Sequence, residues 1–211
     1  MSAGNASSYH GFFDRDLIPK ALKLVFAAWE RLAWSDRSEL EPQITRALAV
    51  VLRRLKQARG LPFSVFCEID PLTEPASRLD FYLLAGPDER AYFTVEAKRL
   101  YIPRESGTDA NLDEYRKTGI MAFIEGAYAP NLPDGAMLGY VMDGDLKRAI
   151  SEVKRMLEDE NHRENLNIST GPKASRYLPK HTHVVETTHK RHANVQGRKL
   201  VVLQHLLVAV G

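Results

Sequence analysis

The 211-residue chain contains very little cysteine and tryptophan, with one cysteine, Cys67, and two tryptophans. A lone cysteine excludes an internal disulfide framework. Because Cys67 lies in the apolar run FSVFCEID, we expect a small core side chain and a reducing compartment. The chain also lacks a strong overall charge, since Lys and Arg exceed Asp and Glu by only two. This balance excludes a general polyanion binder.

Long hydrophobic runs are missing as well. The most strongly apolar segment, LVVLQHLLVAV at residues 200–210, contains Gln204 and His205, and it is far shorter than the roughly 20 residues that span a bilayer. The N-terminus has no charged start followed by an apolar stretch, so no leader is expected. We expect a soluble, cytoplasmic protein without a membrane partner. The 44% hydrophobic and 27% charged residues that are present are ordinary for one globular core.

The small net charge conceals an uneven distribution. Residues 173–199 hold seven Lys or Arg and one Glu, a net charge of +6, so the rest of the chain carries −4. A basic segment of this kind suits contact with a phosphate backbone, although a solvated basic loop would have the same composition. The side chains that we predict to contact nucleic acid are His189, Lys190, Arg191, Arg198 and Lys199.

Hydrophobic periodicity predicts two helices at the start of the chain. Residues 12–34 show apolar side chains at helical spacing, within an N-terminal helical segment 12–36. A second helix is predicted from Ser38, which is suited to cap it, to Gly60, which ends it. Pro42 is tolerated in its first turn.

The period then changes to that of strands. Residues 63–70, 78–85 and 91–100 are short apolar runs, and the turn cluster GPDE joins the last two into an antiparallel hairpin. We then expect a polar loop (99–110), a helix (111–126), a strand (136–144) and a helix (145–160). A mobile polar connection (161–180) and two strands (181–189 and 199–210) complete the chain. This order predicts a single α/β domain over 1–211, with a mixed central sheet flanked by helices and a basic C-terminal segment 173–211.

Three charged residues interrupt the apolar hairpin. In a strand Glu96 and Lys98 point to the same face, and the hairpin pairing places Asp80 opposite Glu96, on strands about 4.8 Å apart. Two close carboxylates repel each other unless a cation compensates them, and Mg²⁺, with Mn²⁺ as a substitute, prefers such oxygen ligands. The pattern therefore predicts a metal site with Lys98 beside it. The alternative is a surface ion pair of Glu96 with Lys98 or Arg99.

Asp80, followed across a hairpin by Glu96, Ala97 and Lys98, resembles the active-site pattern of the PD-(D/E)XK nuclease superfamily, with Leu79 where the motif has proline. The resemblance implies a restriction-endonuclease-like core. It also implies that Asp80, Glu96 and the Ala97 carbonyl are metal ligands, and that Lys98 is the catalytic lysine. A Glu on the preceding helix would complete the site, and Glu41 is the first choice, with Glu39 the alternative.

The function implied is a Mg²⁺-dependent endonuclease. DNA is preferred over RNA as the substrate, although RNA or a branched junction would suit the same site. Residues 115–129 followed by 139–145 resemble the small nucleases of prokaryotic defence systems, which implies an effector of an anti-phage complex. Because nothing in the sequence reads bases, we expect targeting by a homodimer or a partner subunit. The alternative function is a non-catalytic subunit that binds nucleic acid or assists assembly.

Overall fold

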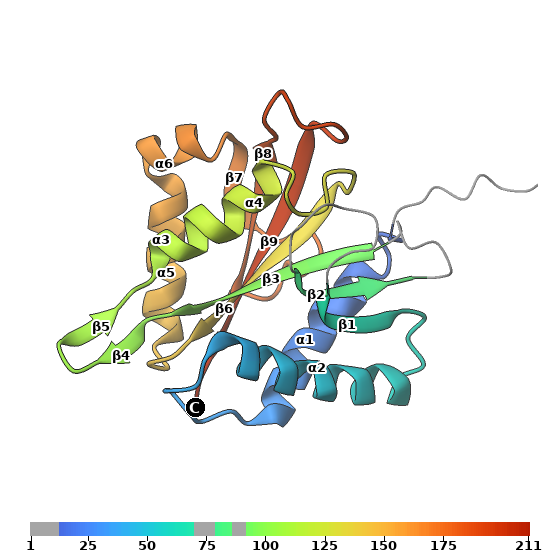
Figure 1. The fold of residues 1–211 in the computed structure, drawn as a ribbon, viewed down its shortest axis with the longest axis vertical. Helices are drawn as coiled ribbons and strands as arrows, with labels where there is room; N and C mark the ends of the chain where they lie inside the picture. Colours follow the sequence, from blue (N-terminus) through green and yellow to red (C-terminus); the bar gives the residue numbers. More distant parts are fainter. Residues whose placement is uncertain (1–12, 70–78, 86–91) are drawn as a thin grey trace, which may run out of the picture.

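The structure, a computed structural model, describes residues 13–69, 79–85 and 92–211 (Figure 1). Its helices are α1 (Ile18–Leu32), α2 (Glu41–Ala58), α3 (Leu112–Glu114), the π-helical turn η1 (Tyr115–Ile120), α4 (Met121–Ile124), α5 (Leu146–Glu158) and α6 (Glu160–Asn165). Its strands are β1 (Ser64–Ile69), β2 (Leu79–Leu84), β3 (Tyr92–Leu100), β4 (Ile102–Arg104), β5 (Gly107–Asp109), β6 (Asp134–Val141), β7 (Ile168–Ala174), β8 (Val184–Lys190) and β9 (Leu200–Ala209).

Seven strands form one mixed sheet in the order β1-β2-β3-β6-β9-β8-β7. The central strands β3, β6 and β9 are parallel, whereas β1 and β2 on one side and β8 and β7 on the other pair antiparallel. The predicted hairpin is present as β2 and β3. The expectation of an α/β fold with a mixed sheet between helices is thus confirmed.

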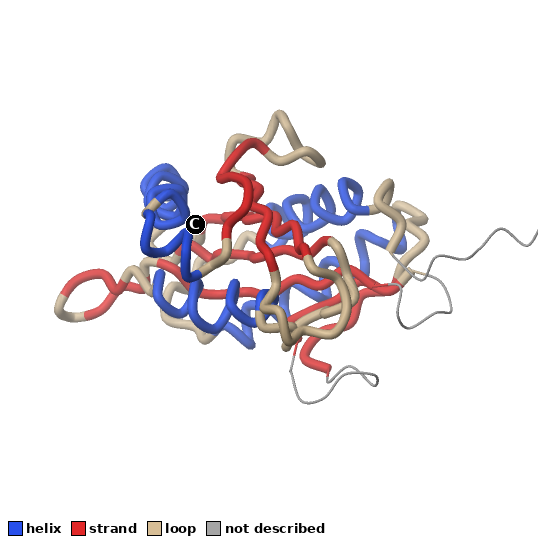
Figure 2. The backbone as a smooth tube through the Cα atoms, turned by 90° about the horizontal axis from the view of Figure 1, so that it is seen from above, coloured by secondary structure: helices blue, strands red, loops and turns tan. Residues whose placement is uncertain are grey.

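Helices cover both faces of this sheet (Figures 1 and 2). Side chains alternate along a strand, so Leu138 and Tyr140 of β6 pack with α1 and α2, whereas Met137 and Val141 pack with η1, α4 and α5. Each fully buried Leu of these two cores stabilises the fold by about 1.5–3 kcal/mol. Trp29 of α1 also donates its indole N–H to the carbonyl of Ala209 in β9, at 2.7 Å. In the described part of the chain, no helix combines the length and apolarity needed to cross a membrane.

Several predicted boundaries are wrong for local reasons. Helix α2 begins at Glu41 rather than at Ser38, because the backbone N–H and hydroxyl of Ser38 both donate to the Asp36 carboxylate. The predicted polar loop 99–110 contains the end of β3 and the small hairpin β4–β5, which projects from the body in Figure 1. The predicted mobile connection 161–180 contains most of α6 and all of β7. Asp159 caps α6 by accepting a hydrogen bond from the His162 N–H.

The predicted helix 111–126 is present as α3, η1 and α4 in succession. Gly119 lies in its π-helical turn against the sheet, where a Cβ atom would collide with the Met137 side chain and lie 3.8 Å from Cγ of Lys98. Glycine is favoured here by close approach rather than by backbone conformation, since a Cβ atom would force the flexible end of the Met137 side chain to move. The helix covers the aliphatic part of Lys98, which belongs to the candidate site.

Candidate metal centre at the edge of strand β3

The edge of β3 beyond its pairing with β2 carries the candidate site. The described ladder between β2 and β3 ends at Phe81 and Val95, while β3 continues to pair with β6 on its other side. Backbone groups on the open side still need partners, and carboxylates supply them. The Ala97 N–H donates to Asp80 Oδ2 at 2.6 Å, and the Arg99 N–H donates to Glu41 Oε2 at 3.0 Å.

Lys98 lies among the same acidic groups. Its ammonium is 2.6 Å from Glu96 Oε1 and 3.5 Å from Glu41 Oε1, and it donates to the Ala97 carbonyl at 2.9 Å. Asp80, Glu41, Glu96, Ala97 and Lys98 are therefore all brought together, as the hairpin pattern and the resemblance predicted. The hairpin pattern accounts for Asp80, whereas Glu41 converges with residues 96–98 only through the tertiary fold.

Of the two glutamates considered for the helix position, Glu41 contacts Lys98. Glu39 contributes its backbone carbonyl, which accepts a hydrogen bond from Arg99 Nη1 at 2.9 Å. Glu41 reaches the strand because it is the first residue of α2, and the start of that helix lies against the open edge of β3.

The charges in this cluster do not balance. Burial, followed by the nearby Asp80 carboxylate, raises the pKa of Glu96 to about 8, and burial also raises the pKa of Glu41. Burial by itself would lower the pKa of Lys98, but the Glu96 and Glu41 carboxylates outweigh it and raise that pKa. One ammonium thus faces three carboxyl groups. A second cation would relieve the excess negative charge.

The residues fit the donor chemistry of a hard divalent cation. Asp80, Glu96 and Glu41 offer carboxylate oxygens and Ala97 a carbonyl, which are the ligands that Mg²⁺ prefers. Glu96 Oε2 is buried and accepts no hydrogen bond within the described residues, so it is available to a ligand. Within residues 13–69, 79–85 and 92–211, no group of three or more His, Cys, Asp or Glu side chains is placed, as it stands, to hold a metal ion. The Lys98 ammonium instead contacts three of the candidate ligand oxygens, which are Glu96 Oε1, Glu41 Oε1 and the Ala97 carbonyl oxygen.

Sequence reasoning missed two polar side chains of the site. Tyr128, in the loop between α4 and β6, donates its hydroxyl hydrogen to Glu96 Oε1 at 3.3 Å. Asn111 donates through Nδ2 to the Arg99 carbonyl at 2.8 Å, on the same open edge of β3. Neither belongs to a local pattern, because Tyr128 is 32 residues from Glu96 in the sequence and Asn111 is 12 residues from Arg99.

A cavity of about 360 Å³ adjoins Lys98, formed where α2, β3 and the helix that starts at Leu112 meet. It is lined by Leu40, Glu41, Pro42, Lys98, Arg99, Asn111, Glu114 and Thr118. The cavity gives the ammonium and the Glu41 carboxylate access to a ligand from outside, which a purely internal ion pair would not need.

Two of the predicted phosphate-binding residues are wrong. His189 is fully buried in β8, and Arg191 is only 4% exposed. The Arg191 guanidinium donates hydrogen bonds to four backbone carbonyls. A phosphate cannot reach either side chain. Some of the cations in this basic segment thus have structural roles. One example is Arg176, whose Nε and Nη2 both donate hydrogen bonds to the buried Glu186 carboxylate.

His189 instead belongs to a buried chain of hydrogen bonds across the sheet. Its Nδ1 can only donate to the Leu166 carbonyl, at 2.8 Å, so Nε2 accepts from the Thr187 hydroxyl, at 2.7 Å. That hydroxyl oxygen accepts from His205 Nε2 at 2.7 Å, and His205 Nδ1 accepts from the Tyr115 hydroxyl at 2.9 Å. When all hydrogen bonds run in this direction, from Tyr115 to the Leu166 carbonyl, each side chain has a partner and both imidazoles are neutral. Burial accordingly lowers the pKa of His189 to about 4 and that of His205 to about 3.

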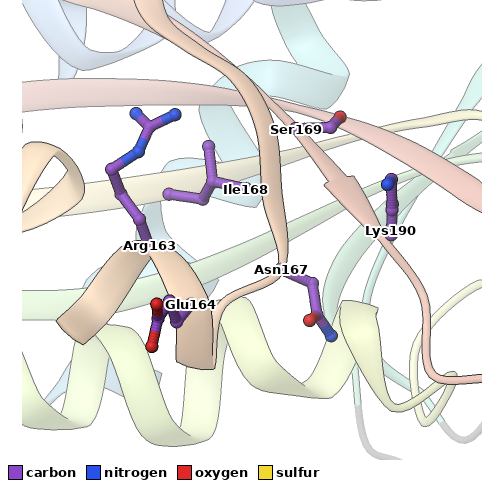
Figure 3. Close-up of a pocket in the computed structure, with 6 residues that line it drawn as sticks. All are labelled: Arg163, Glu164, Asn167, Ile168, Ser169 and Lys190. Carbon is purple, nitrogen blue, oxygen red and sulfur yellow. The ribbon is translucent and has the colours of Figure 1, made fainter. Parts of the chain in front are cut away.

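The other predicted contacts, Lys190, Arg198 and Lys199, lie at the surface. Lys190 lines an open cavity of about 480 Å³ with Arg163, Glu164, Asn167, Ile168 and Ser169 (Figure 3). Figure 3 shows Arg163 and Lys190 on either side of β7, and Arg163 donates to the Gly171 carbonyl at 2.6 Å. The two cations therefore do not converge on one anion.

A scan against protein-family models, a search of curated proteins and a search of solved structures each found no match to this chain. Function is therefore inferred from the geometry and charge of the site.

Proposed function

We propose that this protein is a metal-dependent phosphodiesterase that cuts nucleic acid, with DNA as the preferred substrate and a restriction-endonuclease-like core. The observation that carries the proposal is the convergence of Asp80, Glu96, Glu41 and Lys98 at the open edge of β3, where one ammonium meets three carboxyl groups. A purely structural ion pair would not need this excess of negative charge, which costs stability.

The side chains have separate roles in this proposal. Asp80, Glu96, Glu41 and the Ala97 carbonyl would hold Mg²⁺ or Mn²⁺. When bound, the metal would polarise the scissile phosphate and lower the pKa of a coordinated water. Lys98 would supply a cation and N–H donors beside the phosphate, to orient the attacking water or to neutralise charge that develops on the phosphate oxygens. The cavity at Lys98 would admit the substrate backbone.

Substrate contacts beyond the centre would be mainly electrostatic. Lys190, Arg198 and Lys199 are exposed and would bind phosphates without reading bases. Targeting would then come from a second copy of the chain or from a partner subunit. The resemblance to small defence nucleases leads us to propose an effector role in an anti-phage complex.

A direct test incubates the purified protein with supercoiled plasmid, linear duplex, single-stranded DNA and RNA, each in Mg²⁺, Mn²⁺ or EDTA. Cleavage is expected with either metal and not in EDTA. Asp80→Asn and Lys98→Ala should abolish it, whereas Lys154→Ala and Glu158→Gln, at exposed positions on α5, should cleave like the wild type. Cleavage that survives both site substitutions would refute the assignment.

A non-catalytic subunit is the second candidate, favoured by one observation. The Lys98 ammonium contacts Glu96, Ala97 and Glu41, as in a closed structural network. For such a subunit, none of the substrates is cut in either metal, and Lys98→Ala lowers the melting temperature without changing nucleic-acid binding.

A further inference from the structure

One buried arginine, Arg191, holds the loop between α4 and β6, residues 125–133, by hydrogen bonds to its backbone. Arg191 Nη1 donates to the carbonyls of Phe123 at 2.5 Å and Tyr128 at 3.3 Å. Its Nη2 donates to the carbonyls of Ala129 at 2.8 Å and Leu132 at 2.9 Å. A guanidinium offers five N–H donors in a rigid plane, so a single side chain can fix several turns of backbone at once.

Backbone contacts from the following segment hold the same loop. The His192 N–H donates to the Ile124 carbonyl at 3.1 Å, and the Arg198 N–H donates to the Pro130 carbonyl at 3.0 Å. Gly197 approaches so closely that a Cβ atom there would lie 2.6 Å from the Pro130 oxygen. The loop is therefore held along its length by residues that follow β8, and it cannot shift without breaking these bonds.

This fixed loop carries Tyr128 to the candidate metal centre. The Tyr128 ring packs edge-on against Phe123, with ring centroids 5.6 Å apart. Its hydroxyl reaches Glu96 Oε1 in a long hydrogen bond of 3.3 Å. Tyr128 therefore links the Arg191 clamp to Glu96.

The two oxygens of Glu96 are thereby made different. Oε1 accepts hydrogen bonds from Lys98 Nζ at 2.6 Å and from the Tyr128 hydroxyl at 3.3 Å, which occupies both of its lone pairs. Oε2 is buried and accepts no hydrogen bond among the described residues. Turning the carboxylate about its terminal bond would move Oε1 away from both donors, so these two hydrogen bonds also fix the direction of Oε2.

We propose that Tyr128, fastened by Arg191, is a positioning residue that holds Glu96 so that Oε2 is the oxygen presented to the metal. This inference rests on the proposed function, because it concerns how that site binds its cation. Groups that orient a ligating side chain change metal affinity by about 10-fold to 100-fold when they are removed. The hydroxyl of Tyr128 should therefore affect the dissociation constant for the metal more than it affects folding.

The test compares Tyr128→Phe with Tyr177→Phe. Tyr177 is a matched control, because it is also half-buried and donates its hydroxyl hydrogen to a carboxylate, that of Asp134, at 3.0 Å. Mn²⁺ binding is measured on the full chain by electron paramagnetic resonance of the free ion and by calorimetry. Tyr128→Phe should weaken Mn²⁺ binding by about 10-fold or more, while Tyr177→Phe binds like the wild type. Both variants should have wild-type melting temperatures in EDTA, to within about 3 °C.

Arg191→Lys tests the clamp separately, because lysine retains the charge but cannot reach four carbonyls. It should weaken Mn²⁺ binding in the same direction and accelerate amide exchange in residues 125–133, and Arg176→Lys provides the remote arginine control. If the wild type binds Mn²⁺ and Tyr128→Phe binds it equally well, the inference is refuted and the proposed function stands. If the wild type binds no Mn²⁺, both are refuted.

Discussion

Replacing Glu96 with glutamine should stabilise the metal-free protein. The Glu96 pKa is raised from 4.5 to about 8, first by burial and then by Asp80. At pH 7 the folded protein therefore retains a proton that the unfolded chain releases. The difference corresponds to about 3 kcal/mol of lost stability at pH 7, since one pKa unit equals about 1.4 kcal/mol. Glutamine has the same shape without this cost.

The sign of the effect also fixes its pH dependence. A folded-state pKa above the unfolded one means that the folded protein binds more protons between pH 4.5 and about 8. Wild-type stability should therefore fall across that window as the pH rises. The advantage of Glu96→Gln should grow from near zero below pH 4.5 to about 5 kcal/mol above pH 8.

Urea unfolding in EDTA at several pH values measures the difference in unfolding free energy between Glu96→Gln and the wild type, and thermal unfolding in EDTA gives the melting temperatures. At pH 7 the melting temperature of Glu96→Gln should lie about 6–12 °C above the wild type, as expected for about 3 kcal/mol in a chain of this size. Glu158→Gln, on the exposed face of α5, should leave stability unchanged. Saturating Mg²⁺ should raise the stability of the wild type and have little effect on Glu96→Gln.

The opposite result would refute this reasoning. If Glu96 and Lys98 form a stabilising structural ion pair, removal of the carboxylate leaves a buried ammonium with less compensation, and Glu96→Gln should cost about 3–5 kcal/mol. A lower melting temperature in EDTA would therefore favour the non-catalytic scaffold.

Two further predictions concern other parts of the network. Lys98→Ala should remove cleavage while the chain still binds measurable Mn²⁺ in calorimetry, because the proposed ligand oxygens of Asp80, Glu41 and Ala97 remain and the Tyr128 hydroxyl still holds Glu96 Oε1; cleavage that persists would contradict the proposed role of the lysine. Burial lowers the pKa of His189 to about 4, so the unfolded chain binds the extra proton below pH 6.5 and stability is lost as the pH falls towards 4. Between pH 7 and pH 5.5 this histidine should cost about 1 kcal/mol. The stability difference between wild type and His189→Asn should change by that amount in urea unfolding, and a constant difference would exclude a buried neutral His189.

The basic segment shows why composition was a poor guide to surface chemistry. Three side chains of this segment are chemically suited to phosphate but bind protein groups instead. His189 donates to the Leu166 carbonyl, Arg191 donates to carbonyls of the loop 125–133, and Arg176 pairs with the buried Glu186 carboxylate. Sequence position does not distinguish a cation that binds a ligand from one that binds backbone. Burial and hydrogen-bond partners distinguish them.

Short-range patterns were sufficient for the long helices and the central strands and for part of the site, but they missed β4, β5, most of α6 and β7. Alternation along a strand places Glu96 and Lys98 on one face, and the turn signal GPDE predicts the hairpin that brings Asp80 opposite Glu96. The GPDE residues themselves, 86–89, lie outside the described residues, but β2 and β3 pair antiparallel as this prediction requires. The helical periods of α1, α2 and α5 follow equally from local spacing.

Long-range packing decided the remainder. Glu41 reaches Lys98 because the start of α2 lies against the open edge of β3, and Tyr128 reaches Glu96 because Arg191, 63 residues later in the chain, holds its loop. The spacing of residues within one helix or strand does not predict such contacts, since each depends on how separate elements pack against the sheet. The local sequence therefore determined which charged residues share a strand face, and only the tertiary structure determined which additional groups surround them and how far each is buried.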